Sequence, residues 1–167
     1  DLVVKDLNSD QVGVTRLGII PPSFDPESLS TSSLILSDYL RPEDDEKRLN
    51  EMFVIGDIKV RPNLAKVFDK RDPFWIYVHV YNAALDQTSL NPALTASFRV
   101  SKNGEAVFED VDDKGESIQF YSGQRVVLIR QLPLEGLELG KYQIEVEVSD
   151  RISDGTVAVT EDFEVGG

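Results

Sequence analysis

Apolar and polar residues alternate with a period of two along most of this chain, and this pattern constrains the fold more than any other feature. A period of two is the side-chain alternation of a β-strand, whereas a helix would give a period of 3.6. The spacing of these runs and the turn-rich segments between them predict an all-β chain, an antiparallel sandwich of the Ig-like or fibronectin type III-like class. The predicted strands cover residues 3–7, 12–20, 52–61, 74–81, 94–102, 105–111, 117–121, 125–132, 142–149 and 156–165.

The connections between the runs carry local predictions. Asn103-Gly104 predicts a tight type I′ hairpin turn, because both of its central residues must take positive φ. Residues 21–33, PPSFDPESLSTSS, are rich in proline and serine and predict a linker or a long crossing loop, and LILSDYL after them predicts a short strand. Residues 41–52, RPEDDEKRLNEM, form the one stretch that predicts a helix, of one or two turns, with Pro42 at a first-turn position.

The chain opens with a version of the stretch that closes it. VVKDLNSDQVGVT at 3–15 matches VSDRISDGTVAVT at 148–160 when Asp6 is set on Asp150, with one gap that brings VGVT onto TVAVT. The last two strands of an Ig-like sandwich, F and G, form such a hairpin. We therefore expect residues 1–22 to form a β-hairpin that resembles the last two strands of a preceding domain. Residues 23–50 would be a Pro/Ser-rich and acidic connection with a short strand, and residues 51–167 the Ig-like sandwich.

Two alternatives for the opening hairpin stay open. Short Val-rich hairpins can resemble one another by chance. A hairpin with free edges can also pair with a second copy of the chain, which would make a homodimer.

Composition excludes several classes of protein. Thirty acidic against seventeen basic residues give a net charge of −13, a field that repels phosphate backbones and anionic lipid surfaces. No apolar run approaches the length of a membrane span, and the absence of cysteine excludes a disulfide framework and thiolate zinc sites. We therefore expect no nucleic-acid partner and no membrane insertion.

Tyr142 marks the expected start of strand F. LELGKYQIEVEVSD places a turn glycine, Gly140, two residues before this tyrosine, which is where a tyrosine corner belongs. In such a corner the hydroxyl bonds back to a nearby main-chain group. The alternative is a tyrosine that only packs in a half-buried strand.

The strand FWIYVHVY contains the chain's candidate binding surface. Alternation puts Trp75, Tyr77, His79 and Tyr81 on one face and the aliphatic residues on the other, which is the natural core face. An outward row of aromatic side chains is either a platform for a sugar or a partner, or it is covered by the segment that precedes it. We favour coverage by the opening hairpin and by residues 33–37, SLILS, because it would satisfy both surfaces.

No group of residues predicts a catalytic centre. The single histidine, His79, lies in a strand and has no serine or cysteine nucleophile at a meaningful spacing. Phosphate-binding glycine motifs are missing, and the acids in turns give no sign of a glycosidase cleft. We therefore expect no enzyme activity and no cofactor.

One loop resembles the calcium-binding loop of an EF-hand. DVDDKG at 110–115 has acids at the first and third places and glycine at the sixth, but Lys114 stands at the fifth and Tyr121 at the twelfth. These two departures reject an EF-hand, and we expect no metal site. A looser site at a domain junction stays open, and its oxygen ligands would come from Asp6, Asp10, Asp150 or Asp154.

Several stretches together resemble a known family. FVIGDIKVRPN, VFDKRDPFWIYVHVYN, LPLEGLELGKYQIEVEVSDRIS and a closing FEV are similar to the C-terminal Ig-like region of bacterial proteins named for a GWxTD motif, common among acidobacteria. VVKDLNSDQVGV through LSTSSLILSD resembles the end of the domain that precedes it in that family and in related von Willebrand A-type proteins. The GWxTD motif itself is absent from this sequence, so no function attached to it carries over.

The resemblance covers nearly the whole chain and implies an exported, multidomain, non-catalytic protein, located outside the cell or in the periplasm. We expect a spacer or protein-protein interaction domain whose partners are proteins, either other domains of the same chain or a separate protein. The alternative is a carbohydrate-binding module that uses the aromatic strand face.

Overall fold

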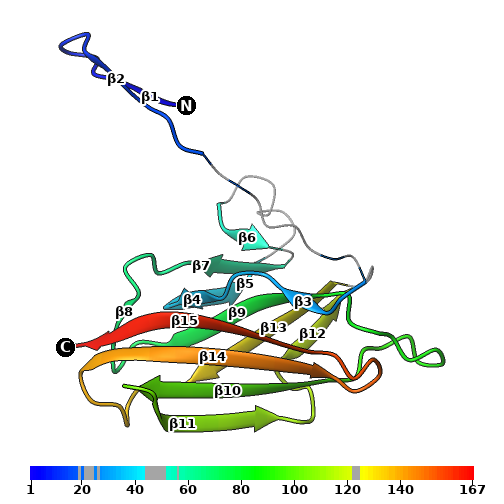
Figure 1. The fold of residues 1–167 in the computed structure, drawn as a ribbon. Coiled ribbons are helices and arrows are strands. Elements are labelled where there is room, and N and C mark those ends of the chain that lie inside the picture. The colour runs from blue at the N-terminus through cyan, green and yellow to red at the C-terminus, as the bar shows by residue number, and fades with distance from the viewer. Residues whose placement is uncertain (19, 21–24, 26, 44–51, 56, 122–124) are drawn as a thin grey trace.

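The computed structural model describes residues 1–18, 20, 25, 27–43, 52–55, 57–121 and 125–167 (Figure 1). Within these ranges every regular element is a β-strand, as the alternation of the sequence predicts. Two sheets pack face to face to form a β-sandwich. A small third sheet lies against one of them, and a separate hairpin precedes all three.

The first sheet of the sandwich has the order β11-β10-β14-β15-β8. Its strands are antiparallel, except that β8 runs parallel to the end of β15. These strands are β8 (Val67–Asp69), β10 (Leu94–Lys102), β11 (Glu105–Asp112), β14 (Gly140–Asp150) and β15 (Thr156–Gly166).

The second sheet is built around β9, which pairs on one side with β13 and on the other with two short strands, β3 and β4. All of these pairings are antiparallel. Its strands are β3 (Ser30–Thr31), β4 (Ile35–Ser37), β9 (Phe74–Tyr81), β12 (Ile118–Tyr121) and β13 (Arg125–Leu132).

The sandwich ends in a hairpin. One sheet has the neighbouring strands β4, β9, β13 and β12, and the other has β11, β10, β14 and β15. The last two strands in the chain, β14 and β15, lie side by side and antiparallel.

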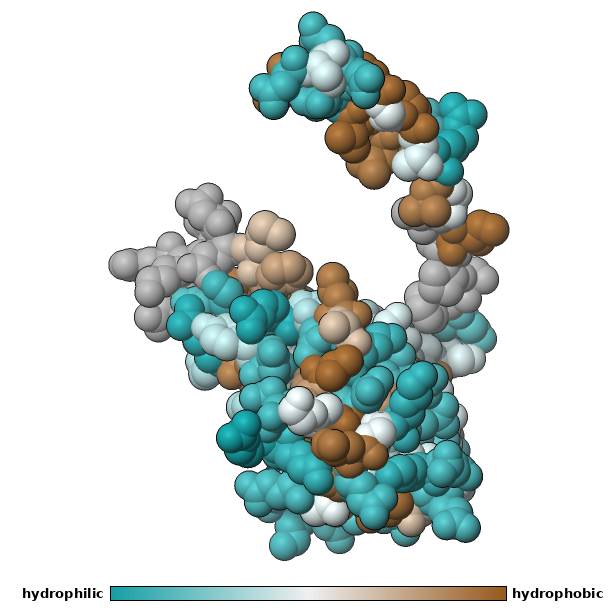
Figure 2. Space-filling model, turned by 90° about the vertical axis from the view of Figure 1, so that its left-hand side faces the viewer, coloured by the Kyte–Doolittle hydropathy of each residue, from teal (hydrophilic) through white to brown (hydrophobic). Residues whose placement is uncertain are grey.

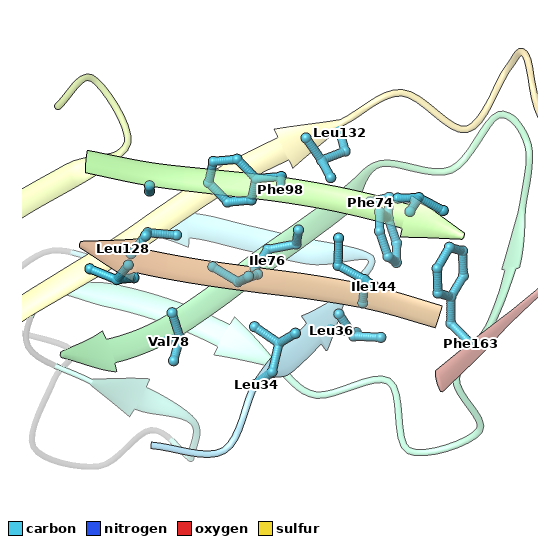
Figure 3. Packing of buried hydrophobic residues seen from close by; sticks show 14 of the residues in the cluster. Leu34, Leu36, Phe74, Ile76, Val78, Phe98, Leu128, Leu132, Ile144 and Phe163 are labelled. Carbon is cyan, nitrogen blue, oxygen red and sulfur yellow. The ribbon is translucent and has the colours of Figure 1, made fainter. Parts of the chain in front are cut away.

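The main core lies between the two sheets (Figure 3). Alternate residues of β9 point into it, among them Ile76 and Val78, and they meet Ile144 of β14. At one end the aromatic rings of Phe68, Phe74 and Phe163 pack together, with the first two edge to face at 4.8 Å between ring centroids. Burial of this continuous apolar set is the main favourable contribution to folding.

The β10–β11 connection forms the tight turn that its sequence predicts. Asn103 and Gly104 both have positive φ, 54° and 83°, and Lys102 pairs with Glu105 across the turn. This geometry is that of a type I′ turn, which matches the right-handed twist of the flanking strands.

A third sheet covers part of the outer face of the β9 sheet. It contains β5 (Tyr39–Pro42), β7 (Ile58–Arg61) and β6 (Val54–Ile55). The buried hydroxyl of Ser37 fixes the change of sheet between β4 and β5: its Oγ lies 2.7 Å from both Tyr39 O and Arg61 O and accepts the Tyr39 N–H at 2.9 Å. A serine suits this place because its hydroxyl both donates and accepts.

The opening hairpin, β1 (Leu2–Lys5) with β2 (Val12–Thr15), is separate from the sandwich (Figure 1). All residues from 1 to 18 are exposed. Both faces of the hairpin hold exposed apolar side chains, Leu2 and Val4 on one face and Val3, Val12 and Val14 on the other. On the face of the sandwich that Figure 2 shows, hydrophilic residues flank a narrower band of apolar ones.

The strand pairing corrects the expected start of the sandwich at residue 51. β3 and β4 pair with β9, and the side chains of Leu34 and Leu36 lie in the main core (Figure 3). The sandwich therefore includes residues 30–37. The sequence pattern missed this because SLILS is too short to show a period of two by itself.

Other local predictions differ in detail. Pro42, expected in the first turn of a helix, is the last residue of β5, and residues 44–51 of that expected helix lie outside the described residues. β2 ends at Thr15 instead of continuing to residue 20. Residues 52–61 contain two short strands instead of one.

Candidate functional site

The aromatic row of β9 is only partly accessible. Tyr77 is 1% exposed, and Val60 of β7 and Val127 of β13 bury it in a second apolar cluster to which Leu40 and Ile55 add contacts. Trp75, His79 and Tyr81 are half-buried. The third sheet thus covers the centre of the row, as the favoured alternative predicts, and an open aromatic platform is interrupted there.

The covering segment differs in part from the expected one. Ile35 of SLILS packs on the Tyr77 side, but Leu34 and Leu36 point the other way, into the main core. Most of the cover comes from β5, β6 and β7. The opening hairpin takes no part, since its residues are all exposed.

His79 is held between two tyrosines. Its Nε2 lies 2.7 Å from the Tyr77 hydroxyl, and the ring centroids of Tyr77 and Tyr81 lie 5.4 and 5.9 Å from its own. The Ser32 hydroxyl accepts the backbone N–H of His79 at 3.0 Å. These contacts position the histidine as part of the sheet surface, and the Ser32 hydroxyl bonds its backbone and not its imidazole ring.

Tyr142 makes the hydrogen bond of a tyrosine corner. Its hydroxyl donates to Glu138 O at 2.9 Å, four residues upstream, as the sequence predicts. Gly140 between them has a φ of 134°, which other residues rarely adopt. The Tyr142 ring stacks on Phe163, with 5.6 Å between centroids, and ties the corner to the core.

Four turns share one short motif, of which the sequence alignment found only the copies at Asp6 and Asp150. In each turn an aspartate is followed three residues later by a serine, and the aspartate carboxylate accepts hydrogen bonds from the turn. Such bonds are the reason that aspartate favours turns. The four pairs are Asp6 with Ser9, Asp25 with Ser28, Asp86 with Ser89 and Asp150 with Ser153. The recurrence of D-x-x-S in the sequence is the signal that could have located Asp25 and Asp86.

Two of these turns meet at the end of the sandwich where the chain enters it. Asp150 accepts the Ala84 N–H at 2.7 Å, which ties the β14–β15 turn to the loop after β9. The amide of Asn82, in the same loop, donates to Ser28 O at 2.9 Å and to Asp25 O at 3.3 Å. The entering segment is thus fastened to the sandwich by side-chain bonds.

The acids proposed for a calcium site are used in other ways. Asp150 is buried and accepts from Ala84, Ile152 and Ser153, while Asp6 and Asp10 lie on the separate hairpin. Within the described residues no group of three His, Cys, Asp or Glu side chains is placed to hold a metal ion.

The acids of the rejected EF-hand loop are also engaged. The Asp112 carboxylate is buried and accepts bonds from Glu116 N, Ser117 N and the Ser117 hydroxyl. Burial alone would raise the pKa of Asp112, but these hydrogen bonds outweigh it and lower the pKa below its ordinary value. Asp110 pairs with Arg130 at 2.6 Å. The loop therefore acts as a structural turn.

A groove of about 490 Å³ lies at the opposite end, beside the turn that contains Gly104. Its lining includes Lys66, which pairs with Glu161 at 2.6 Å, and Gln143, which donates to Asp162 at 3.0 Å. The groove is open and mixed in polarity, and it lacks the convergent reactive groups of an active site.

Comparison with known proteins leaves the chain without an assigned family. No family model matches the sequence, and no curated protein matches it. The described residues also include no helix that is long and apolar enough to cross a membrane.

Proposed function

We propose that this chain is a non-catalytic, Ig-like β-sandwich module of a larger exported bacterial protein, where it acts as a spacer between neighbouring protein domains. The observation that carries this proposal is that the chain enters the sandwich at one end and leaves it at the other. A module with this geometry holds its neighbours apart by its own length. The bacterial and exported setting, outside the cell or in the periplasm, rests on the resemblance of the strand segments described above.

The entry is fastened by two contacts. Asn82 bonds the carbonyl oxygens of Asp25 and Ser28, and Leu29 lies against Gly155 in the β14–β15 turn. The exit is at the far end of β15, where β8 pairs with it and Leu139 lies near Gly167. β15 has eleven residues, which at about 3.3 Å each separates the two ends by roughly 35 Å.

The competing carbohydrate-binding function is less well supported by the aromatic face. A sugar platform needs adjacent exposed rings, and the central ring of the row, that of Tyr77, is buried under the third sheet. Trp75 and Tyr81 remain half-buried on either side of it. The role in protein-protein interaction stays compatible with the spacer, since each neighbour is itself a protein domain.

Distance measurements between the two ends test the spacer function. The chain has no cysteine, so Glu27→Cys with Gly167→Cys gives two unique sites for spin labels. We expect one narrow distance distribution, because the turn that contains Glu27 is bonded to the sandwich. A broad distribution in this double variant would contradict a rigid spacer.

Asn82→Gly provides the matched control. Asn82 has a φ of 60°, which glycine adopts freely, so this change removes the amide and leaves the backbone unstrained. The distance distribution should broaden while the melting temperature changes little. The same control shows whether the fastening depends on the two bonds from this side chain.

A further inference from the structure

The turn of the opening hairpin and the turn between β14 and β15 are built in the same way. The Asp6 N–H donates to Gln11 O at 2.9 Å, and the Asp150 N–H donates to Gly155 O at 2.8 Å. Both turns therefore have the same length. The gap that the sequence alignment introduced between Asp6 and the following strand is wrong.

The side chains of the two turns also match. In the hairpin, Asn8 N donates to Asp6 Oδ1 at 2.8 Å and the Ser9 hydroxyl to Asp6 Oδ2 at 2.6 Å. In the sandwich, Asp150 Oδ1 accepts from Ile152 N and Asp150 Oδ2 from the Ser153 hydroxyl, both at 2.9 Å. The fifth residue of each turn, Asp10 or Asp154, has positive φ, 54° or 58°.

The strands on either side extend the match beyond the turn. A turn of the same kind at Asp86 is followed by a single bridge, between Leu85 and Pro92, so the turn alone identifies nothing. In both hairpins, however, the ladder continues outward from the turn with the same register over the four residue pairs of β1 and β2. Lys5 pairs with Val12 and Val4 with Gly13, as Ser149 pairs with Thr156 and Val148 with Val157.

The register shows which face of the hairpin corresponds to a core face. Leu2 and Val4 occupy the places of Val146 and Val148, which are fully buried in the sandwich. In the hairpin the same places are 61% and 63% exposed. Two-stranded hairpins are marginal in water by themselves, so this face requires a cover.

The β14–β15 hairpin shows what that cover is. β10 pairs with its first strand, the opposite sheet packs on its inner face, and the Ala84 N–H from the loop after β9 bonds Asp150 Oδ2 at 2.7 Å. Asp6 Oδ2, the matching atom, accepts only from the Ser9 side chain among the described residues. A backbone N–H from another domain, placed as the Ala84 N–H is beside Asp150, would give Asp6 Oδ2 the same second hydrogen bond.

We propose that β1–β2 is the F–G hairpin of a second, preceding β-sandwich. That domain supplies a strand to the free edge of β1, an apolar sheet over Leu2 and Val4, and a backbone N–H for Asp6. This inference rests on the proposed role as a module between protein domains and specifies the docking surface toward the domain on the entry side.

A second copy of this chain is a poorer occupant. In each copy the place of the last hairpin is filled, because β14 already pairs with both β10 and β15. Among the described residues, the first sheet has two long free edges, that of β11 and that of residues 156–163 in β15. Glu105, Glu109 and Asp110 of β11 and Glu161 and Asp162 of β15 oppose edge-to-edge pairing with another strand. The occupant must therefore be a sandwich that lacks its own last hairpin.

A graft within the full chain tests this proposal. Replacing residues 146–159 by the sequence of residues 2–15, both fourteen positions long, puts the hairpin where β14 and β15 meet. We expect cooperative thermal unfolding at a lower midpoint than the parent, because Gly13 and Thr15 replace two half-buried valines. We also expect slow hydrogen exchange at the Ala84 amide, since Asp6 then occupies the place of Asp150.

Two variants of the graft make the result decisive. A shorter graft, residues 2–11 in place of 146–155, keeps Val157 and Val159. If the longer graft fails to fold and the shorter one folds, the cause is the loss of these two valine side chains and not a poor fit of Leu2 and Val4 in the core. A third graft that adds Val4→Lys to the shorter one buries a charge and should lose cooperative unfolding. The proposal is wrong if the shorter graft unfolds without cooperativity, or folds while its Ala84 amide exchanges as fast as a free loop.

The state of the parent chain in solution distinguishes the second copy. We expect a monomer by light scattering. A dimer that Leu2→Ser with Val4→Ser converts to a monomer would overturn the preceding sandwich as the occupant. The distance between residues 27 and 167 tests the spacer within one module, so the two proposals can fail independently.

Discussion

The backbone N–H of Ala84 donates to the Asp150 carboxylate at 2.7 Å, and this bond joins the loop after β9 to the turn that begins the last strand. The Arg151 N–H of the same turn adds a second bond to that loop, to Ala93 O at 2.9 Å. The carboxylate is buried and also accepts from Ile152 N and the Ser153 hydroxyl. Burial alone would raise the pKa of Asp150, but these hydrogen bonds outweigh it, and the pKa lies below its ordinary value.

This bonding predicts acid sensitivity. A carboxyl group whose pKa is lowered in the folded state stabilises the fold above its unfolded pKa, near 3.9, and that contribution is lost as the pH falls through the folded pKa. Asp69, whose pKa the Arg71 hydrogen bond lowers to about 2, acts in the same direction. We expect the melting temperature to be steady between pH 7 and 5 and to fall steeply below pH 4.

Asp150→Asn checks the contribution of this residue. The amide keeps the shape but donates where the carboxylate accepted, so we expect about 2 kcal/mol less stability at pH 7 and a shallower acid dependence than in the parent. Asp86→Asn, in an exposed turn of the same motif, is the control and should change the neutral midpoint much less. Equal losses from the two changes would contradict the special place of Asp150.

The hydroxyl of Tyr142 should contribute measurably to stability. Tyr142→Phe keeps the ring against Phe163 and removes the bond to Glu138 O, so we expect a loss of about 1 kcal/mol in urea titration. Tyr39→Phe is the control, since the Tyr39 hydroxyl makes no hydrogen bond within the described part of the chain. An unchanged unfolding midpoint in the Tyr142 variant would leave the corner as a packed ring only.

Residues 30–37 should be essential for the sandwich to fold. A fragment of residues 51–167, which the sequence pattern predicts to be complete, lacks β3, β4 and the two core side chains of this segment, Leu34 and Leu36. We expect this fragment to unfold at a much lower temperature than a fragment of residues 25–167, which should match the full chain. Circular dichroism melting curves of the two fragments measure this.

Single substitutions separate this effect from that of chain length. Leu36→Ala should cost about 2–5 kcal/mol, the usual range for a buried leucine, whereas Leu7→Ala on the exposed hairpin turn should cost little. A fragment 51–167 as stable as the full chain would show that the core closes without β3 and β4.

The sequence predicts the fold well where residues alternate over a long stretch. The bounds predicted for β9, β10 and β13 agree with the structure, because each is a run of eight or nine residues rich in apolar side chains and ends at turn residues. The two- and three-residue strands β3 and β8 were missed, since their pairing depends on β9 and β15 and not on local pattern. Propensity carries little information at that length.

In the candidate site, too, the sequence predicts local features and misses those that depend on tertiary packing. Tyr142 and Gly140 could be placed because the corner is a local motif that a turn glycine marks. The burial of Tyr77 could not be predicted, because β5 and β7 cover it and they contact β9 through tertiary packing. These two strands are also separated from each other in the sequence by residues 43–57. Alternation identifies an aromatic face but contains no information about what packs on it.

Trp75 reports on that face directly, because it is the single tryptophan of the chain. It lies next to Ser37 across the β4–β9 pairing and next to Gln131 across the β9–β13 pairing, and it is half-buried. We therefore expect an emission maximum between those of a buried and of a free indole, with moderate acrylamide quenching.

Deleting residues 1–18 should leave the emission of Trp75 unchanged, since the hairpin does not cover the ring. Deleting residues 1–50 removes β4 and should shift the maximum to the red. A red shift on removal of residues 1–18 alone would instead show that the hairpin folds back over β9, and a freely quenched Trp75 in the intact chain would favour the carbohydrate platform.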